Sequence, residues 1–229
     1  MSQNRIQPIE ESKKTIAAIV RDRIRAAILE GVLPAGSRID QNRLASDLNV
    51  SLVPVREALK KLEGEGFVQI IPRRGAFVTE ASLKDMEDLY FARNILEGEV
   101  AFHAAGKLTD DDLDALDRLM PRMTEALAAQ DYPRFTELNR QFHFIIYNAA
   151  GSAYLSNMIA GLWELAERYR YRYIFMSDRS SVIQAEHQSI LDACHARDGE
   201  RLREAIVYHM NQTFLGIRAY ISSNRRHEE

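Results

Sequence analysis

The chain of 229 residues has little cysteine and no long apolar run. Its single cysteine, Cys194, has no partner for a disulfide within the chain. With one thiol, we expect neither a cysteine-based metal site nor a catalytic cysteine. No segment reaches the roughly 20 uninterrupted apolar residues of a transmembrane helix. The segment from Met1 to Lys14 lacks the apolar core of a secretory signal. These absences exclude membrane-spanning and disulfide-rich secreted classes, and we expect a cytoplasmic protein.

The chain also lacks a strong excess of basic charge. Its net charge is −3 at pH 7, whereas a protein that neutralises DNA phosphates needs concentrated lysine and arginine. This average conceals two regions, because residues 1–80 hold 13 basic and 10 acidic residues and the remainder holds 17 and 23. The length favours two domains. We therefore predict a domain of net charge +3 over residues 1–80 and one of net charge −6 over residues 81–229.

Apolar residues at helical spacing predict two helices before residue 50. The first helix repeats an apolar residue every four positions, at Ile16, Val20, Ile24 and Ile28. It is expected to end at Gly31, before Pro34. The second helix is predicted from about Gln41 to Leu48, and Asn49 follows it where a tight turn uses left-handed backbone.

A third helix and a basic hairpin are predicted next. Ser51 can cap this helix. Its buried face carries Val55, Leu59 and Leu62, and its opposite face carries Leu52, Arg56 and Lys60. The runs Phe67–Ile71 and Ala76–Val78 favour β-strands, with Arg73 and Arg74 at the tip between them.

Three helices followed by a basic hairpin are typical of a winged helix-turn-helix. In that architecture the third helix enters the major groove, where arginine makes paired hydrogen bonds to guanine, and the wing reaches the backbone or the minor groove. An exposed Arg or Lys taken singly is often only a solvated charge, and for Lys60 alone this alternative and a DNA contact are equally open. The combination of a Ser-capped helix with a basic hairpin tip is more specific, and it indicates binding to double-stranded DNA.

The segment from Leu44 to Leu59, continued by Leu62, Glu63, Gly66 and Phe67 and by Pro72 to Val78, closely resembles the DNA-binding domain of the GntR family of bacterial transcriptional regulators. The resemblance implies that Arg56 contacts the operator, with Arg73 and Arg74 on the wing. Family members typically carry Arg where this chain has Leu52, and often Thr where it has Val53. This difference shifts base readout towards thymine methyl groups. The residues expected to contact DNA are Arg43, Ser51, Leu52, Val53, Arg56, Lys60, Arg73, Arg74 and Gly75.

The chain after residue 84 shows no period-two alternation, and glycine and proline are sparse there. The pattern predicts helices at Leu83 to Ala105, Thr109 to Ala129, Asp131 to Ala149, Ser152 to Met176, Ser180 to Ala196 and Glu200 to Ser222. Short loops favour an antiparallel bundle, which builds ligand sites from inward-facing side chains. The expected fold class is therefore mainly α, with an N-terminal winged helix-turn-helix and a C-terminal antiparallel all-helical bundle.

Histidines on the bundle helices are the candidate metal ligands. Asn139 and His143 lie four residues apart on one face of a helix, and His187 and His209 fall on the last two helices. Neutral imidazoles from three helices, with an asparagine carbonyl oxygen, are suitable ligands for a divalent metal. The alternative is ordinary hydrogen-bonded histidines, because spacing does not show convergence. His103, His195 and His227 have no such companions, so we expect them to be structural or solvated.

The run from Leu138 to His143, together with Glu186, His187, Ile190, Leu191, Ala193, Asp198, Ala205 and His209, resembles the metal-binding effector domain of the FadR-type branch of the same family. The resemblance implies an Asp or Asn and three His as ligands, which here are Asn139, His143, His187 and His209. Zinc is the expected metal, with nickel or manganese as alternatives. Asn139 in place of a carboxylate lowers the negative charge of such a site.

Arg93 and Glu97 also match the family pattern of an Arg followed by Leu and Glu. One interpretation is that they bind a small carboxylate effector, which an arginine holds by paired charge-assisted hydrogen bonds beside the metal. The other is an ion pair between residues four apart on a helix surface. The run from Glu167 to Tyr173 alternates arginine with tyrosine, and it suits a subunit interface better than a pocket wall.

We expect a homodimeric, ligand-responsive repressor that binds a palindromic operator, because one short recognition helix contacts too few base pairs for specificity in a genome. A metal-dependent hydrolase is the first alternative, since a metal with an open position activates water. The chain lacks an HExxH motif, a nucleophile elbow and a Gly-rich phosphate loop, so we do not expect an enzyme. A helical dimerisation protein without a ligand is the second alternative.

Overall fold

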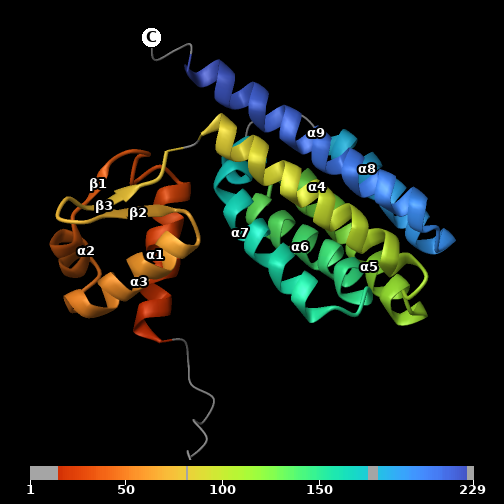
Figure 1. The fold of residues 1–229 in the computed structure, drawn as a ribbon, viewed down its shortest axis with the longest axis horizontal. Helices are drawn as coiled ribbons and strands as arrows, with labels where there is room; N and C mark the ends of the chain where they lie inside the picture. The colour runs from red at the N-terminus through yellow and green to blue at the C-terminus, as the bar shows by residue number, and fades with distance from the viewer. Residues whose placement is uncertain (1–14, 81, 175–179, 226–229) are drawn as a thin grey trace, which may run out of the picture. The chain divides into compact units, whose positions relative to one another are not determined.

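The computed structural model describes residues 15–80, 82–174 and 180–225. The chain divides into two compact units, Met1–Glu80 and Ala81–Glu229 (Figure 1), and each is considered by itself. Among the described residues, no helix is long and apolar enough to cross a membrane.

The first unit combines helices with a small antiparallel sheet. Its helices are α1 (Ile16–Leu29), α2 (Gln41–Asp47) and α3 (Leu52–Gly64). Its strands are β1 (Arg38–Ile39), β2 (Val68–Ile71) and β3 (Gly75–Val78), in the sheet order β1-β3-β2. The β2–β3 hairpin is the predicted wing. The strand β1, which pairs Arg38 with Phe77, was not predicted, because a strand of two residues has no periodicity to detect.

The core of the first unit forms where α1 packs on α3. Val20 and Ile24 of α1 and Leu59 of α3 are each at most 3% exposed. Asn49, between α2 and α3, adopts the predicted left-handed backbone with φ 52°. Ile16, the first member of the apolar repeat, is 61% exposed, because the inward face of α1 passes through Ala17.

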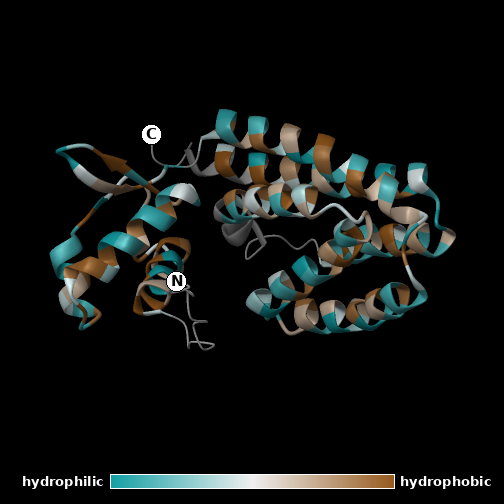
Figure 2. Ribbon diagram, turned by 60° about the horizontal axis from the view of Figure 1, so that its bottom comes forward, coloured by the Kyte–Doolittle hydropathy of each residue, from teal (hydrophilic) through white to brown (hydrophobic). Residues whose placement is uncertain are grey.

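The second unit is all-helical over its described residues. Its helices are α4 (Leu83–Ala105), α5 (Asp110–Ala128), α6 (Tyr132–Ala149), α7 (Ala153–Ile174), α8 (Ser180–Ala196) and α9 (Gly199–Arg225). Hydrophobic and hydrophilic residues alternate along these helices (Figure 2), as amphipathic helices require. The predicted bounds agree closely, although the predicted end of the fourth helix at Met176 lies outside the described residues. Thr109 and Asp112 cap α5 reciprocally, as a capping box.

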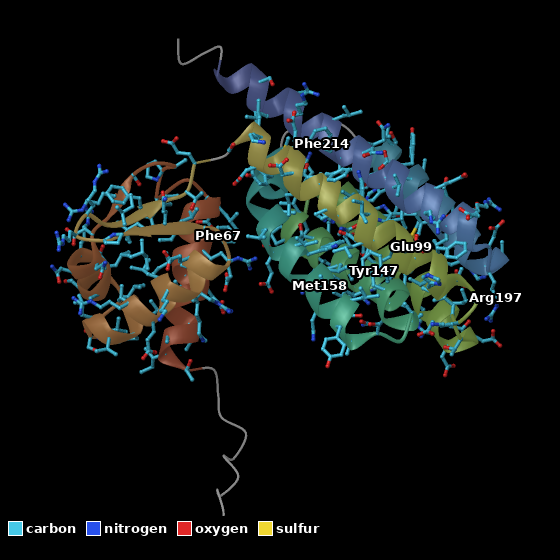
Figure 3. All side chains as sticks on the ribbon, viewed as in Figure 1. Phe67, Glu99, Tyr147, Met158, Arg197 and Phe214 are labelled. Atoms are coloured by element: carbon cyan, nitrogen blue, oxygen red, sulfur yellow. The ribbon has the colours of Figure 1, made fainter. Side chains whose placement is uncertain are left out.

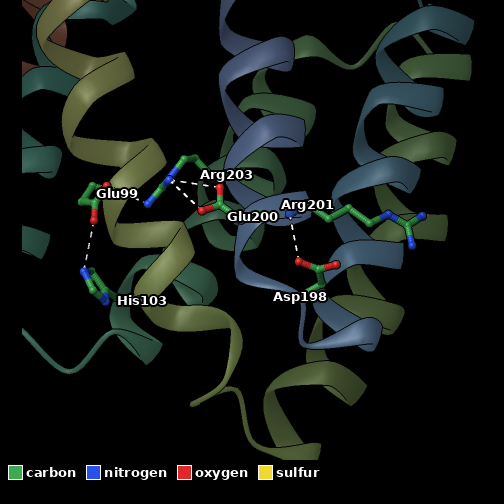
Figure 4. A network of polar contacts seen from close by, with 6 residues as sticks. All are labelled: Glu99, His103, Asp198, Glu200, Arg201 and Arg203. Carbon is green, nitrogen blue, oxygen red and sulfur yellow. Dashed lines mark hydrogen bonds and ion pairs between the residues drawn. The ribbon is translucent and has the colours of Figure 1, made fainter.

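Helices α4 and α9 pack side by side in antiparallel directions (Figure 1). A Cβ added to Gly98 would lie only 2.9 Å from Val207 Cγ2, so glycine permits the close approach. Polar side chains also join the pair. Asn94 donates to Asn211 at 2.8 Å, and the Arg203 guanidinium donates to Glu99 at 2.9 Å within a surface network of charged residues (Figure 4).

Tyr169 of α7 belongs to the core of the second unit. It is 2% exposed, and its hydroxyl donates to the Ser82 carbonyl oxygen at 3.4 Å. The expectation that this tyrosine lies in a subunit interface is therefore wrong, because it is buried within its own chain. The side chains of Arg168 and residues 170–173 of the same run lie outside the description.

Candidate nucleic-acid interface and metal centre

The predicted recognition helix α3 presents one exposed face. Arg56 and Lys60 are exposed, and Val53 is 62% exposed, whereas Val55 on the opposite face is fully buried. Leu52, predicted on the same face, is only partly exposed and also packs against the core of the unit. The face therefore combines an apolar residue with two cations, as base edges and phosphates require.

Ser51 holds the N-cap position of α3, but its side chain makes no capping hydrogen bond. The predicted cap by this hydroxyl is therefore wrong. The backbone of Ser51 is extended, with φ −73° and ψ 168°, as it is at other N-caps. The exposed Ser51 thus stays on the recognition face without the capping role that its residue type predicted.

The wing places two cations at its tip. Arg73 and Arg74 are exposed, and the Arg74 amide donates to the Ile71 carbonyl oxygen at 3.0 Å to close the turn. Arg73 has φ 63° and Gly75 has φ 106°. Glycine adopts a φ of 106° more readily than other residues, so Gly75 allows the backbone to turn at the tip of the wing.

Arg43 and Arg56 each have a partner within the first unit. Arg43 Nε lies 3.6 Å from the Asp47 carboxylate in an exposed pair on α2. Arg56 Nε donates to Gln41 Oε1 at 3.4 Å, which links α3 to the start of α2. A groove of about 420 Å³ adjoins this link, and it includes Arg38 of β1, which the sequence patterns did not single out.

The structure brings His143, His187 and His209 together inside the second unit. They come from α6, α8 and α9, and their candidate ligand nitrogens all lie within 4.8 Å of one another. The three residues are 1%, 1% and 9% exposed. Asn139 adjoins them, with its Oδ1 2.7 Å from His187 Nε2. The predicted ligand set is thus one buried cluster.

Each of these histidines has a partner at Nδ1. His187 Nδ1 lies 2.8 Å from the Ile183 carbonyl oxygen, and His209 Nδ1 lies 2.7 Å from Glu186 Oε2. His143 Nδ1 lies 3.3 Å from the Tyr147 hydroxyl. A neutral imidazole that donates through Nδ1 keeps a lone pair on Nε2, which is the form that binds a metal. The sequence patterns did not identify Glu186 or Tyr147 in this role.

Burial keeps His187 neutral. Loss of solvation and the neighbouring His209 lower the pKa of His187 from 6.5 to about 3. With its Nδ1 hydrogen on Ile183, His187 directs a lone pair at the carbonyl oxygen of Asn139, and two lone pairs at 2.7 Å repel each other. The repulsion is relieved when the Asn139 amide turns its NH₂ group toward His187. It is also relieved when Asn139 Oδ1 and His187 Nε2 both bind a cation. Three imidazoles and an amide oxygen are ligands that suit a divalent metal.

Arg93 and Glu97 form an ion pair, but not on the surface. Arg93 is 2% exposed and Glu97 is fully buried, so the expectation of a surface pair is corrected. The Arg93 guanidinium donates to both carboxylate oxygens, at 2.6 and 3.3 Å. The carboxylate also accepts from the Tyr147 hydroxyl at 2.6 Å and from Trp163 Nε1 at 2.9 Å. Burial opposes the charge of Arg93, but the combined effect of Glu97, Tyr90 and Tyr147 is larger and raises the pKa of the guanidinium.

This ion pair adjoins the histidine cluster. The Trp163 ring lies 5.0 Å from the Arg93 guanidinium carbon and 5.3 Å from the His143 ring centre. Tyr147 connects Glu97 to His143 directly, and Figure 3 shows this tyrosine among the helices of the second unit. The spacing of Arg93 and Glu97 could not reveal this network, because Tyr147 and Trp163 lie 50 and 66 residues from Glu97 in the sequence.

The remaining candidates lie apart from the cluster. His103 is near Glu99 at 3.2 Å and His195 is near Asp117 at 2.9 Å, both on the surface, while His227 lies outside the described residues. Burial raises the pKa of the Cys194 thiol to about 12, which keeps it protonated and unreactive at neutral pH.

The comparisons with known proteins match both units. Residues 16–78 match the family of bacterial regulatory proteins called the gntR family, and residues 88–212 match the FCD domain. The HTH-type transcriptional repressor RspR of Escherichia coli (strain K12) is 26% identical over 201 residues, which cover 88% of each chain. The HTH-type transcriptional regulator BphR of Paraburkholderia xenovorans (strain LB400) is 31% identical over 93% of this chain and 89% of its own.

A solved structure supports the fold. The structure of E. coli McbR/YncC matches with a TM-score of 0.75 at 24% identity, over 91% of this chain and 100% of that chain. Together with the winged helix-turn-helix and the helical bundle, these matches identify the chain as a DNA-binding transcriptional regulator of the GntR family with a C-terminal FCD domain.

Proposed function

We propose that the FCD domain binds a divalent metal and a small organic acid, and that the acid controls the affinity of the DNA-binding domain for its operator. The convergence of three buried histidines beside Asn139 carries this proposal. Asn139, His143, His187 and His209 would hold the metal, with zinc as the first choice and nickel or manganese as alternatives. When bound, the metal would supply a Lewis acid that attracts a carboxylate oxygen.

Arg93 is the proposed second anchor of the acid. Arginine holds carboxylates by paired hydrogen bonds, and Arg93 is separated from the histidine cluster only by Trp163 and Tyr147. An incoming carboxylate would compete with Glu97 for this guanidinium. Glu97 is itself negative, so we assign it to orienting Arg93 and Tyr147 rather than to contacting the acid.

The proposed regulator acts as a homodimer on a palindromic operator. Two recognition helices read two half-sites, which gives the specificity that one helix lacks. Repression is the proposed direction of control, and the similarity to RspR, which is named a repressor, supports it. Because binding free energies are linked, DNA must change the affinity for the acid by the same factor as the acid changes the affinity for DNA.

Elemental analysis of the full chain, purified without chelators, tests the metal. We expect about one equivalent of zinc, nickel or manganese per chain in the wild type and its loss in His187→Ala. His195→Ala is the matched control, because His195 is a surface histidine bonded to Asp117. Absence of metal, together with no thermal stabilisation on adding any of the three ions, would contradict the proposal.

A second experiment tests control by the acid. A duplex enriched from a randomised library by the wild-type chain serves as the operator, and fluorescence anisotropy measures binding with a panel of small mono- and dicarboxylates. We expect at least one acid to lower DNA affinity by about 5- to 150-fold, the usual range of allosteric coupling. An affinity unchanged by every acid, with no thermal shift from any of them, would refute control by a carboxylate.

A further inference from the structure

A groove in the first unit lies between the recognition helix and the wing. Its volume is about 420 Å³, and it is lined by β1, by the start of α2, by Leu52 and Arg56 of α3, and by Gly75 of the wing. The strand β1 contributes Arg38, an exposed cation outside the predicted set of DNA contacts.

The charge of the groove favours an anion. Arg38 and Arg56 bring two guanidinium groups to its lining, and Asp40 brings one carboxylate. Asp40 Oδ1 is already used at the N-terminus of α2, where it accepts from the backbone amides of Asn42 and Arg43 at 3.0 and 3.1 Å. This carboxylate therefore serves as a helix cap.

The sheet and the wing hold Arg38 in place. Its backbone pairs with Phe77 in the β1–β3 ladder. A Cβ built on Gly75 would lie 3.4 Å from Arg38 Nε and 3.6 Å from one terminal nitrogen, so the guanidinium lies against the wing where glycine leaves room. Arg38 thus lies at the boundary between α3 and the wing.

This position corresponds to the sugar-phosphate backbone of a bound duplex. The recognition helix of a winged helix-turn-helix enters the major groove, and the wing reaches the backbone or the adjacent minor groove. A phosphate backbone separates the major from the minor groove of DNA. We propose that Arg38 binds a backbone phosphate of the operator in this groove, through the planar donor fork that suits phosphate oxygens. The inference rests on the assignment of α3 and the wing to DNA.

Anisotropy titrations of the full chain test Arg38→Ala. The probes are the library-enriched duplex and a duplex of the same length with shuffled sequence, each at several salt concentrations. A phosphate contact carries no sequence information. We therefore expect affinity for both duplexes to fall by the same factor, about eightfold per head at 0.1 M salt. The slope of log affinity against log salt should become shallower by about 0.9 per head.

Three further variants separate the possible roles. Arg38→Lys keeps a cation and should retain the salt slope, whereas Arg56→Ala should weaken binding mainly to the enriched duplex. Arg38→Gln removes the positive charge but keeps an amide donor. Circular dichroism checks that each variant is folded. A folded Arg38→Ala or Arg38→Gln with wild-type affinity and slope overturns the inference, and so does a loss confined to the enriched duplex. A wild-type chain that binds both duplexes equally would instead contradict sequence-specific operator binding.

Discussion

Replacing Tyr147 with Phe removes one hydroxyl from the centre of the FCD domain. That hydroxyl donates to the buried Glu97 carboxylate at 2.6 Å and faces His143 Nδ1 at 3.3 Å. A hydrogen bond to a charged buried group contributes about 1.5–3 kcal/mol. We therefore expect Tyr147→Phe to lower the free energy of unfolding by about 2 kcal/mol and the Tm by about 4–8 °C. Trp163, the single tryptophan of the chain, reports this unfolding in urea by its fluorescence.

Tyr154→Phe is the matched control, because Tyr154 on α7 is 86% exposed. This variant should unfold like the wild type. The outer partner of a metal-binding histidine also affects metal affinity, so zinc should bind Tyr147→Phe about 10- to 100-fold more weakly. A loss of stability below about 0.5 kcal/mol, the range of ordinary surface substitutions, would refute the view that Tyr147 satisfies a buried carboxylate.

Three other results are expected. Arg56→Ala should cost about 1–3 kcal/mol of binding to the enriched duplex in anisotropy titrations, and an unchanged affinity would mean that α3 does not read bases. Burial raises the pKa of Cys194 to about 12, so this thiol should resist Ellman's reagent at pH 8 in the native protein and react in urea. A rapid reaction in the native protein would contradict its burial. Gly98→Ala should destabilise the FCD domain by about 1–3 kcal/mol in urea unfolding, because its Cβ would meet Val207 at 2.9 Å. Gly161→Ala, where no atom lies within 4 Å, should be neutral or stabilising, and equal losses in both variants would exclude the steric explanation.

The helices and the wing could be predicted because their signals are local. Apolar spacing and turn residues identified α4 with its observed bounds and the left-handed Asn49. The predictions failed where a neighbouring element decides the outcome. Ile16 fits the apolar repeat of α1, yet the packing partner of α1 selects Ala17 instead. The strand β1 exists only because β3 offers it backbone partners.

The candidate metal site was predictable in its residues but not in its surroundings. Residue type and family resemblance indicated Asn139 and the three histidines, and the fold brings them together. Glu186 was part of the family resemblance, but its bond to His209 was not predicted, because a glutamate on a helix is usually a solvated charge. Burial likewise distinguishes the Arg93–Glu97 pair from a surface ion pair with the same spacing.

The close packing of α4 against α9 also determines how movement travels through the chain. Helix α9 packs closely on α4 where Gly98 faces Val207, and such close packing resists sliding of one helix along the other. His209 lies on α9, and α4 begins at Leu83, three residues after the DNA-binding unit ends at Glu80. Under the proposed control by an acid, a displacement of α9 at the histidine cluster would therefore reach α4, the helix that leads back to the covalent junction with the DNA-binding unit.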